Sequence, residues 1–417
     1  MSKQALVRPE VLAPAGDLEK LKVAITYGAD AVYIGGNAYS LRSRAGNFTY
    51  GEIQEAVRFA RLHQAKVYVA ANMVMHVGDE VGAGEFFRKI RDIGISAVII
   101  SDPGLIEICL NEAQGLPIHL STQASSVNAE TLKFWKNEGL ERVVLARELS
   151  MEEIRAIRQK TDIEIEVFVH GAMCIAYSGR CVLSNHMSLR DANRGGCSQS
   201  CRWKYDLCGF ENAPEKFSMS SVDLSMIEHL PDLIEAGVNS LKIEGRMKSI
   251  HYVSTLSNVY KKAVDTYLTD PKHYQVRQEW IDELWKVAQR ELSTGFYYGL
   301  PSEREQLFGA RQRIPEYKFV GEVISYDEAK RLVTVRQRNV ITKGDELEFY
   351  GPNFVHVKSV VKEMWDEDGV LIKRAPNPMA LITMSLDVKV KPGNMIRCKV
   401  EGLINLYQEN NVQVKRV

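Results

Sequence analysis

Five cysteines lie close together in the segment EVFVHGAMCIAYSGRCVLSNHMSLRDANRGGCSQSCRWKYDLC. They are Cys174, Cys181, Cys197, Cys201 and Cys208, whereas Cys109 and Cys398 stand alone in apolar surroundings. Four thiolates from one folded loop can bind zinc or an iron–sulfur cluster, because both accept a shell made only of sulfur. The alternative is that these thiols are small buried side chains, as free cysteines often are.

The spacing of these thiols bears on which metal they would hold. Six residues separate Cys174 from Cys181, fifteen separate Cys181 from Cys197, and three separate Cys197 from Cys201. Zinc ribbons favour two tight pairs, and only the last of these pairs is tight. An iron–sulfur cluster is wider and tolerates irregular spacing, so the pattern favours a 4Fe-4S cluster while leaving zinc open.

The same segment is basic. One acid, Asp191, stands between His170 and Lys204 against five basic residues, which are Arg180, Arg190, Arg194, Arg202 and Lys204. Cations beside thiolates can offset cluster charge, hold an anionic small molecule or contact RNA phosphates. The alternative is that they pair with carboxylates elsewhere in the fold.

Further candidates stand where predicted strands end. His170 ends one strand, and Lys242, Glu244 and Arg246 lie in SLKIEGR at the end of another. Because strand ends of a barrel seldom carry charge without using it, we expect His170, Glu244 and Arg246 to be catalytic. We expect Arg194, Arg202 and Lys242 to bind a cofactor or another anionic group.

Four other predicted strands are followed by polar residues, which are Asn72, Asp102, Gln123 and Arg147. Capping of the next helix explains such residues equally well, most clearly for Asp102 before Pro103.

Eight short β-branched runs must position these residues. They begin near Glu10, Ala31, Lys66, Ala97, Ile118, Arg142, Ile165 and Ser240, and segments with helical spacing separate them. This alternation predicts a parallel sheet, and eight repeats favour a closed (β/α)8 TIM-like barrel over an open doubly wound sheet. The cysteine loop, residues 170–210, is then an insertion after strand seven, on the face where barrel enzymes carry their active sites.

The chain divides into three predicted parts. Residues 1–300 form the barrel domain, which ends in helices from Ser249 to Leu268 and from about Glu279 to Leu292. Residues 301–316 are charged and punctuated by proline, which is typical of a linker. Residues 317–417 show short alternating runs between turn residues, which predict a small all-β barrel.

The composition of the 417 residues, 45% hydrophobic and 25% charged, excludes disordered and fibrous proteins. The 53 basic and 53 acidic residues cancel, so nucleic acid would have to bind at a local patch. No apolar run suits a signal peptide or a membrane helix, and we expect a cytoplasmic protein with reduced cysteines. GxGxxG, P-loop, HExxH and GxSxG motifs do not occur in a supporting context.

The chain resembles the collagenase-like peptidases of family U32 along essentially its whole length. The resemblance rests on VLAPAG, on STGFYYG near Ser293, on KIEGR, and on residues in and before the cysteine loop. These residues are Glu166, Phe168, His170, Gly171, Ala172, Cys174, Gly179, Cys181, Ser184, Asn193, Arg194, Gly195, Cys197 and Cys201. Within the family the chain is most similar to the tRNA hydroxylation branch.

The resemblance implies an activity: prephenate-dependent hydroxylation of wobble uridine in tRNA to 5-hydroxyuridine, the precursor of 5-methoxyuridine and 5-oxyacetyluridine. It also implies a 4Fe-4S cluster held by Cys174, Cys181, Cys197 and Cys201, with Cys208 as an alternative to Cys201. The partners would be tRNA and a shorter paralogue or a second copy. A peptidase with a structural metal and a non-catalytic iron–sulfur or RNA-binding subunit are the competing hypotheses.

Overall fold

The computed structural model describes residues 6–40, 46–206, 208–209, 217–307 and 315–400. The chain forms two compact units. The first comprises Met1–Arg277 and Arg290–Arg311, and the second comprises Gln278–Gln289 and Gln312–Val417. In the described parts no helix is both long and apolar enough to cross a bilayer.

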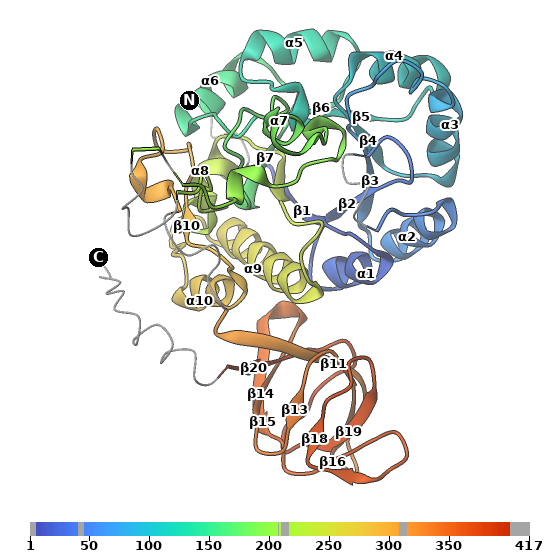
Figure 1. Ribbon diagram of the computed structural model, residues 1–417, viewed down its shortest axis with the longest axis vertical. Helices are drawn as coiled ribbons and strands as arrows, with labels where there is room; N and C mark the ends of the chain where they lie inside the picture. Colours follow the sequence, from blue (N-terminus) through green and yellow to red (C-terminus); the bar gives the residue numbers. More distant parts are fainter. Residues whose placement is uncertain (1–5, 41–45, 207, 210–216, 308–314, 401–417) are drawn as a thin grey trace. The chain divides into compact units, whose positions relative to one another are not determined.

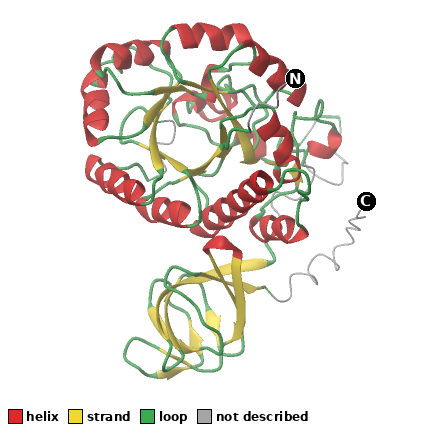
Figure 2. Cartoon of the chain, turned by 180° about the vertical axis from the view of Figure 1, so that it is seen from behind, coloured by secondary structure: helices red, strands yellow, loops and turns green. Residues whose placement is uncertain are grey.

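Eight parallel strands of the first unit form a closed barrel surrounded by helices (Figures 1 and 2). They are β1 (Glu10–Pro14), β2 (Ala31–Gly35), β3 (Lys66–Ala71), β4 (Ala97–Ile100), β5 (Ile118–Leu120), β6 (Arg142–Val144), β7 (Glu164–Gly171) and β9 (Ser240–Ile243). Each pairs with its neighbour in sequence, and β9 closes the ring by pairing with both β1 and β7. The predicted (β/α)8 fold is therefore confirmed.

Within the described ranges, eight helices form the ring. They are α1 (Leu18–Thr26), α2 (Tyr50–Leu62), α3 (Ala83–Ile93), α4 (Pro103–Glu112), α5 (Ala129–Asn137), α6 (Met151–Lys160), α8 (Leu230–Glu235) and α9 (Ile250–Thr269). All except α3 and α8 begin at a residue whose side chain caps the helix. Thr49 and Ser150 form capping boxes with Glu52 and Glu153, which satisfy amides that a helix start leaves unpaired. Asp102 caps α4 through the amides of Gly104 and Leu105, as the capping explanation expected.

Two short strands extend the barrel sheet beside β7. β8 (Asp223–Ser225) runs antiparallel to the end of β7, and β10 (Leu292–Ser293) pairs with β8. The helix expected to reach Leu292 is α10 (Gln278–Val287), which ends earlier and belongs to the second unit. Arg290 then forms a buried ion pair with Asp223 at 2.7 Å, which brings the chain back to the barrel sheet.

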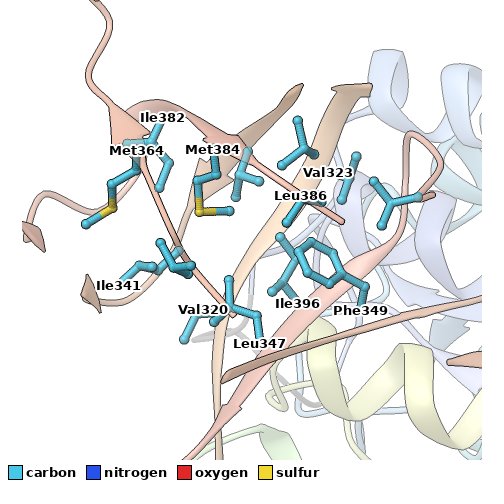
Figure 3. Packing of buried hydrophobic residues seen from close by; sticks show 14 of the residues in the cluster. Val320, Val323, Ile341, Leu347, Phe349, Met364, Ile382, Met384, Leu386 and Ile396 are labelled. Atoms are coloured by element: carbon cyan, nitrogen blue, oxygen red, sulfur yellow. The ribbon is translucent and has the colours of Figure 1, made fainter. Parts of the chain in front are cut away.

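Apart from α10, antiparallel strands form the second unit, and they confirm the β-domain expected from residue 317 onward. The larger sheet contains β11 (Tyr317–Asp327), β12 (Leu332–Gln337), β14 (Glu346–Gly351), β15 (Val355–Val360), β16 (Met364–Trp365), β17 (Leu371–Ile372), β19 (Leu381–Ser385) and β20 (Met395–Lys399). A separate pair joins β13 (Ile341–Thr342) to β18 (Arg374–Ala375). Alternate side chains such as Val320, Leu347 and Ile396 pack into one apolar core (Figure 3).

Candidate active site

The cysteine loop is anchored on segments that follow three different barrel strands. The amide of Ser178 donates to Glu148, after β6, at 2.7 Å. The amide of Val74, after β3, donates to the carbonyl of Asn193 at 3.2 Å. Because these segments leave the carboxyl ends of their strands, the loop lies at the barrel mouth, where α7 (Leu183–Ser188) is seen in Figure 1.

A third anchor is the close approach of Gly179 to Gln123, after β5. A Cβ atom at position 179 would lie 1.9 Å from the carbonyl oxygen of Gln123, and the φ of Gly179 is +75°. Only glycine meets both conditions without strain. Gly179 therefore allows the loop between Cys174 and Cys181 to pack directly on the barrel.

Four of the five clustered thiols influence one another electrostatically. Burial raises the pKa of Cys201, the positive charge of Arg202 opposes this, and Cys174, Cys197 and Cys181 raise the pKa further. Cys208 is not among the largest influences on the pKa of Cys201. It is exposed, as Cys174 and Cys197 also are. The structure thus brings together the four cysteines that the family resemblance names.

The distances between these four sulfurs bear on the kind of metal that fits. Among the described residues of the barrel unit, no three possible ligand atoms of His, Cys, Asp or Glu lie within 4.8 Å of one another. A tetrahedral zinc site has Zn–S bonds of about 2.3 Å, so its sulfurs lie about 3.8 Å apart. No three of these sulfurs are therefore as close together, among the described residues, as the ligands of a zinc site would be.

Arg147 is one of the four polar residues that were noted after predicted strands, and the structure places it within electrostatic reach of Cys174. Its guanidinium stacks 3.7 Å from the centre of the Phe168 ring and lies 4.0 Å from Glu244. Another of its nitrogens donates to the carbonyl of Ala172, in the cysteine loop. Cys174 is exposed at the surface, but desolvation by the surrounding protein raises its pKa, and the charge of Arg147 is the first influence that lowers it.

Glu244 follows β9 at the same mouth and is partly accessible to solvent. Its carboxylate accepts a hydrogen bond from the hydroxyl of Tyr33 at 3.4 Å, and its amide donates to the carbonyl of His170 at 2.8 Å. Its negative charge raises the pKa of Cys174. Glu244 is therefore a carboxylate within electrostatic reach of the thiols.

Arg246 is buried rather than open to the mouth. Its guanidinium donates to Ser40 at 2.9 Å and to Asn47 at 3.3 Å, on either side of the loop after β2. A Cβ atom at Gly35 would lie 2.3 Å from this guanidinium, so any larger residue there would displace it. This packing gives Arg246 a role in holding Ser40 and Asn47 against the segment after β9.

Lys242 lies inside the barrel. It is the third residue of the four-residue strand β9, its ammonium contacts Glu166 at 2.7 Å, and it lies 4.7 Å from the centre of the Tyr33 ring. Burial acts to raise the pKa of Glu166, but Lys242 and Arg142 keep it below its usual value. The charge of Lys242 is already matched by a buried carboxylate, so its expected position at the mouth is wrong.

His170 packs between β7 and α9. Its Nδ1 lies 3.3 Å from the hydroxyl of Tyr260, its ring meets Tyr252 edge-on, and its side chain is buried. Burial lowers the pKa of His170 to about 4. The imidazole is therefore neutral near pH 7 and faces α9.

The two arginines expected to bind a cofactor differ in their surroundings. Arg194 forms an ion pair with Asp79 and donates to the carbonyl of Val74 at 2.8 Å, which anchors the loop. The hydrogen bond from Arg194 is the main cause that lowers the pKa of Asp79 to about 2. Arg202 instead lowers the pKa of both Cys174 and Cys201. Of the two, Arg202 lies among the thiols.

Within the described residues, one group of three possible metal ligands does lie within 4.8 Å, and it belongs to the second unit. It comprises Glu283 of α10, Glu348 and His356. The buried Arg397 contacts both carboxylates at 2.6 Å, and Lys286 contacts Glu283 at the same distance. Two cations already balance two carboxylates, so this group joins α10 to the sheet without needing a metal.

Comparison with known proteins finds similarity along most of the chain. The sequence model described as peptidase family U32 matches residues 16–307, and the model described as the C-terminal domain of that family matches residues 315–397. A Bacillus subtilis protein named tRNA hydroxylation protein P1 is 50% identical over 401 residues, which cover 94% of each chain.

Two other relatives have different names. An Escherichia coli 23S rRNA 5-hydroxycytidine synthase is 39% identical over 266 residues, which cover 63% of this chain and 40% of the synthase. A Porphyromonas gingivalis protein named collagenase is 31% identical over 409 residues, which cover 93% of this chain and 97% of that protein.

Proposed function

This chain belongs to peptidase family U32, and from that membership and the geometry of the barrel mouth we propose that it hydroxylates RNA, with tRNA as its substrate. The observation that carries the proposal is the 50% identity to tRNA hydroxylation protein P1 over nearly the full length of both chains. A second relative, named for a 5-hydroxycytidine product in rRNA, supports hydroxylation at carbon five of a pyrimidine. We propose wobble uridine as the base, 5-hydroxyuridine as the product and prephenate as the co-substrate.

The proposed cofactor is a 4Fe-4S cluster held by Cys174, Cys181, Cys197 and Cys201. Three observations support this ligand set: the thiols come from one loop, they perturb one another, and no three of them lie as close as zinc ligands would. When bound, the cluster supplies one-electron transfer at the barrel mouth. The positive charge of Arg202 beside Cys174 and Cys201 favours their thiolate forms, which are the forms that bind a metal.

The residues around the thiols divide into two proposed roles. Arg147 and Arg202 bind anionic groups, such as the carboxylates of prephenate, because both lie within electrostatic reach of Cys174. Glu244 holds or accepts a proton, since it is a partly accessible carboxylate beside the same thiol. His170, Lys242 and Arg246 position these groups through β7 and β9.

A peptidase with a structural metal is the second candidate, and the relative named collagenase favours it. A cysteine peptidase needs a thiolate paired with a histidine. His170 is buried against Tyr260, and no hydrogen bond joins it to a cysteine among the described residues. Metal analysis of the purified protein separates the two candidates, because zinc without sulfide supports the peptidase and iron with acid-labile sulfide supports the hydroxylase.

A non-catalytic iron–sulfur or RNA-binding subunit is the third candidate. For such a subunit, Glu244→Gln would leave the amount of modified nucleoside unchanged, because Glu244 would have no chemical role. Loss of the product with normal protein accumulation and cluster content would contradict this candidate.

The experiment that tests the proposal is mass spectrometry of tRNA nucleosides from a strain that lacks this gene and any related gene. Complementation with the wild-type chain should restore 5-hydroxyuridine or the nucleosides made from it. The proposal would be contradicted if the wild-type chain accumulated with its cluster but left the amounts of these nucleosides unchanged.

A further inference from the structure

Three cations of the cysteine loop have no partner within the described residues. Arg180, Arg190 and Lys204 form no ion pair and no side-chain hydrogen bond there. The neighbouring Arg194 is paired with Asp79. Cations on the outer helices are also commonly paired, as Lys133 is with Glu130. Unpaired cations gathered on one loop are an electrostatic footprint for an anionic ligand.

The same loop also exposes large apolar side chains, between and beside Arg180 and Arg190 in the sequence. Tyr177 is 68% exposed, Val182 is 68% exposed and Leu189 is 93% exposed, and the other members are Ile175 and Met187. Five such side chains within fifteen residues form a concentration that the outer helices lack, where exposed apolar residues such as Phe134 are scattered. We call these five side chains with Arg180, Arg190 and Lys204 the loop face.

The chemistry of the loop face fits one class of ligand. Duplex RNA keeps its bases stacked and offers mainly phosphates and hydroxyls, which would satisfy the cations alone. Unpaired RNA offers phosphates together with the flat faces of splayed bases, which stack on exposed aromatic side chains such as Tyr177. In sequence, Tyr177 stands near Arg180 and Leu189 stands next to Arg190, so cations and apolar groups alternate.

We propose that the loop face binds unpaired nucleotides of the RNA substrate and presents one base to the barrel mouth. This inference rests on the proposed function, because it concerns the same site. Tyr177 follows Cys174 by three residues, and Arg180 precedes Cys181 directly, so the loop face and the thiols share one segment. An enzyme that modifies a base needs that base outside a helical stack.

The test is equilibrium binding of the full-length protein to two RNAs by fluorescence anisotropy at several salt concentrations. One RNA is a stem with an unpaired loop of anticodon length, and the other is a duplex of equal length. The variants are Tyr177→Ala and Arg180→Ala, and the matched controls are Phe134→Ala and Arg58→Ala, which alter exposed side chains on α5 and α2. Iron content and the thermal unfolding curve identify any variant that loses its cluster or its fold.

If the loop face binds unpaired nucleotides, the wild-type protein should bind the RNA with the unpaired loop more tightly than the duplex. Tyr177→Ala should weaken this binding by about tenfold. Arg180→Ala should lower the slope of log K against log salt by about 0.7, as expected for one lost contact to a single strand. Lys204→Ala provides a second variant at a greater distance from Cys181, with the same expected change. The two controls should bind as wild type does.

Two results would overturn the inference while leaving the proposed function intact. The first is that all loop variants bind RNA as tightly as the wild type does. The second is that Tyr177→Ala changes the oligomeric state but not the RNA affinity, which would make the loop face a protein interface. Failure of the wild type to bind either RNA would overturn both the inference and the proposed function.

Discussion

The guanidinium of Arg147 lies 3.7 Å from the centre of the Phe168 ring. This stacking joins the segment that follows β6 to the middle of β7. Arginine stacks on an aromatic face and still directs its edge nitrogens at other groups. Here one edge faces Glu244 and another binds the carbonyl of Ala172 in the cysteine loop. Arg147 thus links the barrel, the carboxylate and the loop that holds the thiols.

Replacing Arg147 by lysine should therefore reduce the product even though the positive charge remains. Lysine can neither stack flat on Phe168 nor donate in two directions at once. We expect at least a tenfold loss of hydroxylated nucleoside, measured by mass spectrometry, with iron content close to wild type. Arg155→Lys, which alters an exposed ion pair with Asp232, is the control. Full activity of Arg147→Lys would show that charge alone suffices.

Lys242→Met should destabilise the barrel, because it leaves Glu166 buried with fewer cations around it. Removing one partner of a buried ion pair costs about 3 kcal/mol or more. Lys66→Met removes a half-exposed partner of Glu10 and should cost less than about 1 kcal/mol. Denaturant unfolding followed by circular dichroism measures both. Equal unfolding midpoints for the two variants would contradict the interior role of Lys242.

His170 gives the stability of the barrel a dependence on pH that can be measured. Its pKa is about 4 in the folded chain and about 6.5 when unfolded. Between these values the unfolded chain binds the proton more readily, so the free energy of unfolding falls as the pH falls from about 6.5 to about 4. The slope from one such group is at most about 1.4 kcal/mol per pH unit.

His170→Phe should flatten this pH dependence. Phenylalanine can pack against Tyr252 and Tyr260, and the Tyr260 hydroxyl keeps its bond to the carbonyl of Val169 at 2.8 Å. Unfolding midpoints across the acid range provide the measurement, and His273→Phe, at an exposed histidine, is the control. An unchanged slope in His170→Phe would mean that His170 takes up a proton in the folded protein.

The order of strands and helices was predictable because each barrel strand lies in a short, mainly apolar run of Val, Ile, Leu and Ala with no competing pattern. The start predicted near Ile118 coincides with β5, and that near Ser240 coincides with β9. β8 and β10 were not predicted, since β8 (Asp-Leu-Ser) and β10 (Leu-Ser) contain no β-branched residue. Helix α10 belongs to the second unit through contacts of Glu283 with Arg397, which are 114 positions apart in the sequence.

The residues of the site were predictable only in part. The clustering of Cys174, Cys181, Cys197 and Cys201 is visible in the sequence because one loop carries them all. The environments of Lys242 and His170 depend on which face of a strand each side chain occupies. Lys242 points inward to Glu166, a residue of another strand, and a register shift between Phe168 and His170 interrupts the alternation along β7.

Two matched cysteine variants provide the most direct test of the central claim, that four thiols of the loop support RNA hydroxylation. The strain described above is complemented with Cys201→Ser or with Cys208→Ser, and tRNA nucleosides, protein level and bound iron are measured together. We predict that Cys201→Ser accumulates but loses iron and the hydroxylated nucleoside, whereas Cys208→Ser retains both. Full product from Cys201→Ser, or loss of product and iron from Cys208→Ser, would contradict the proposed ligand set.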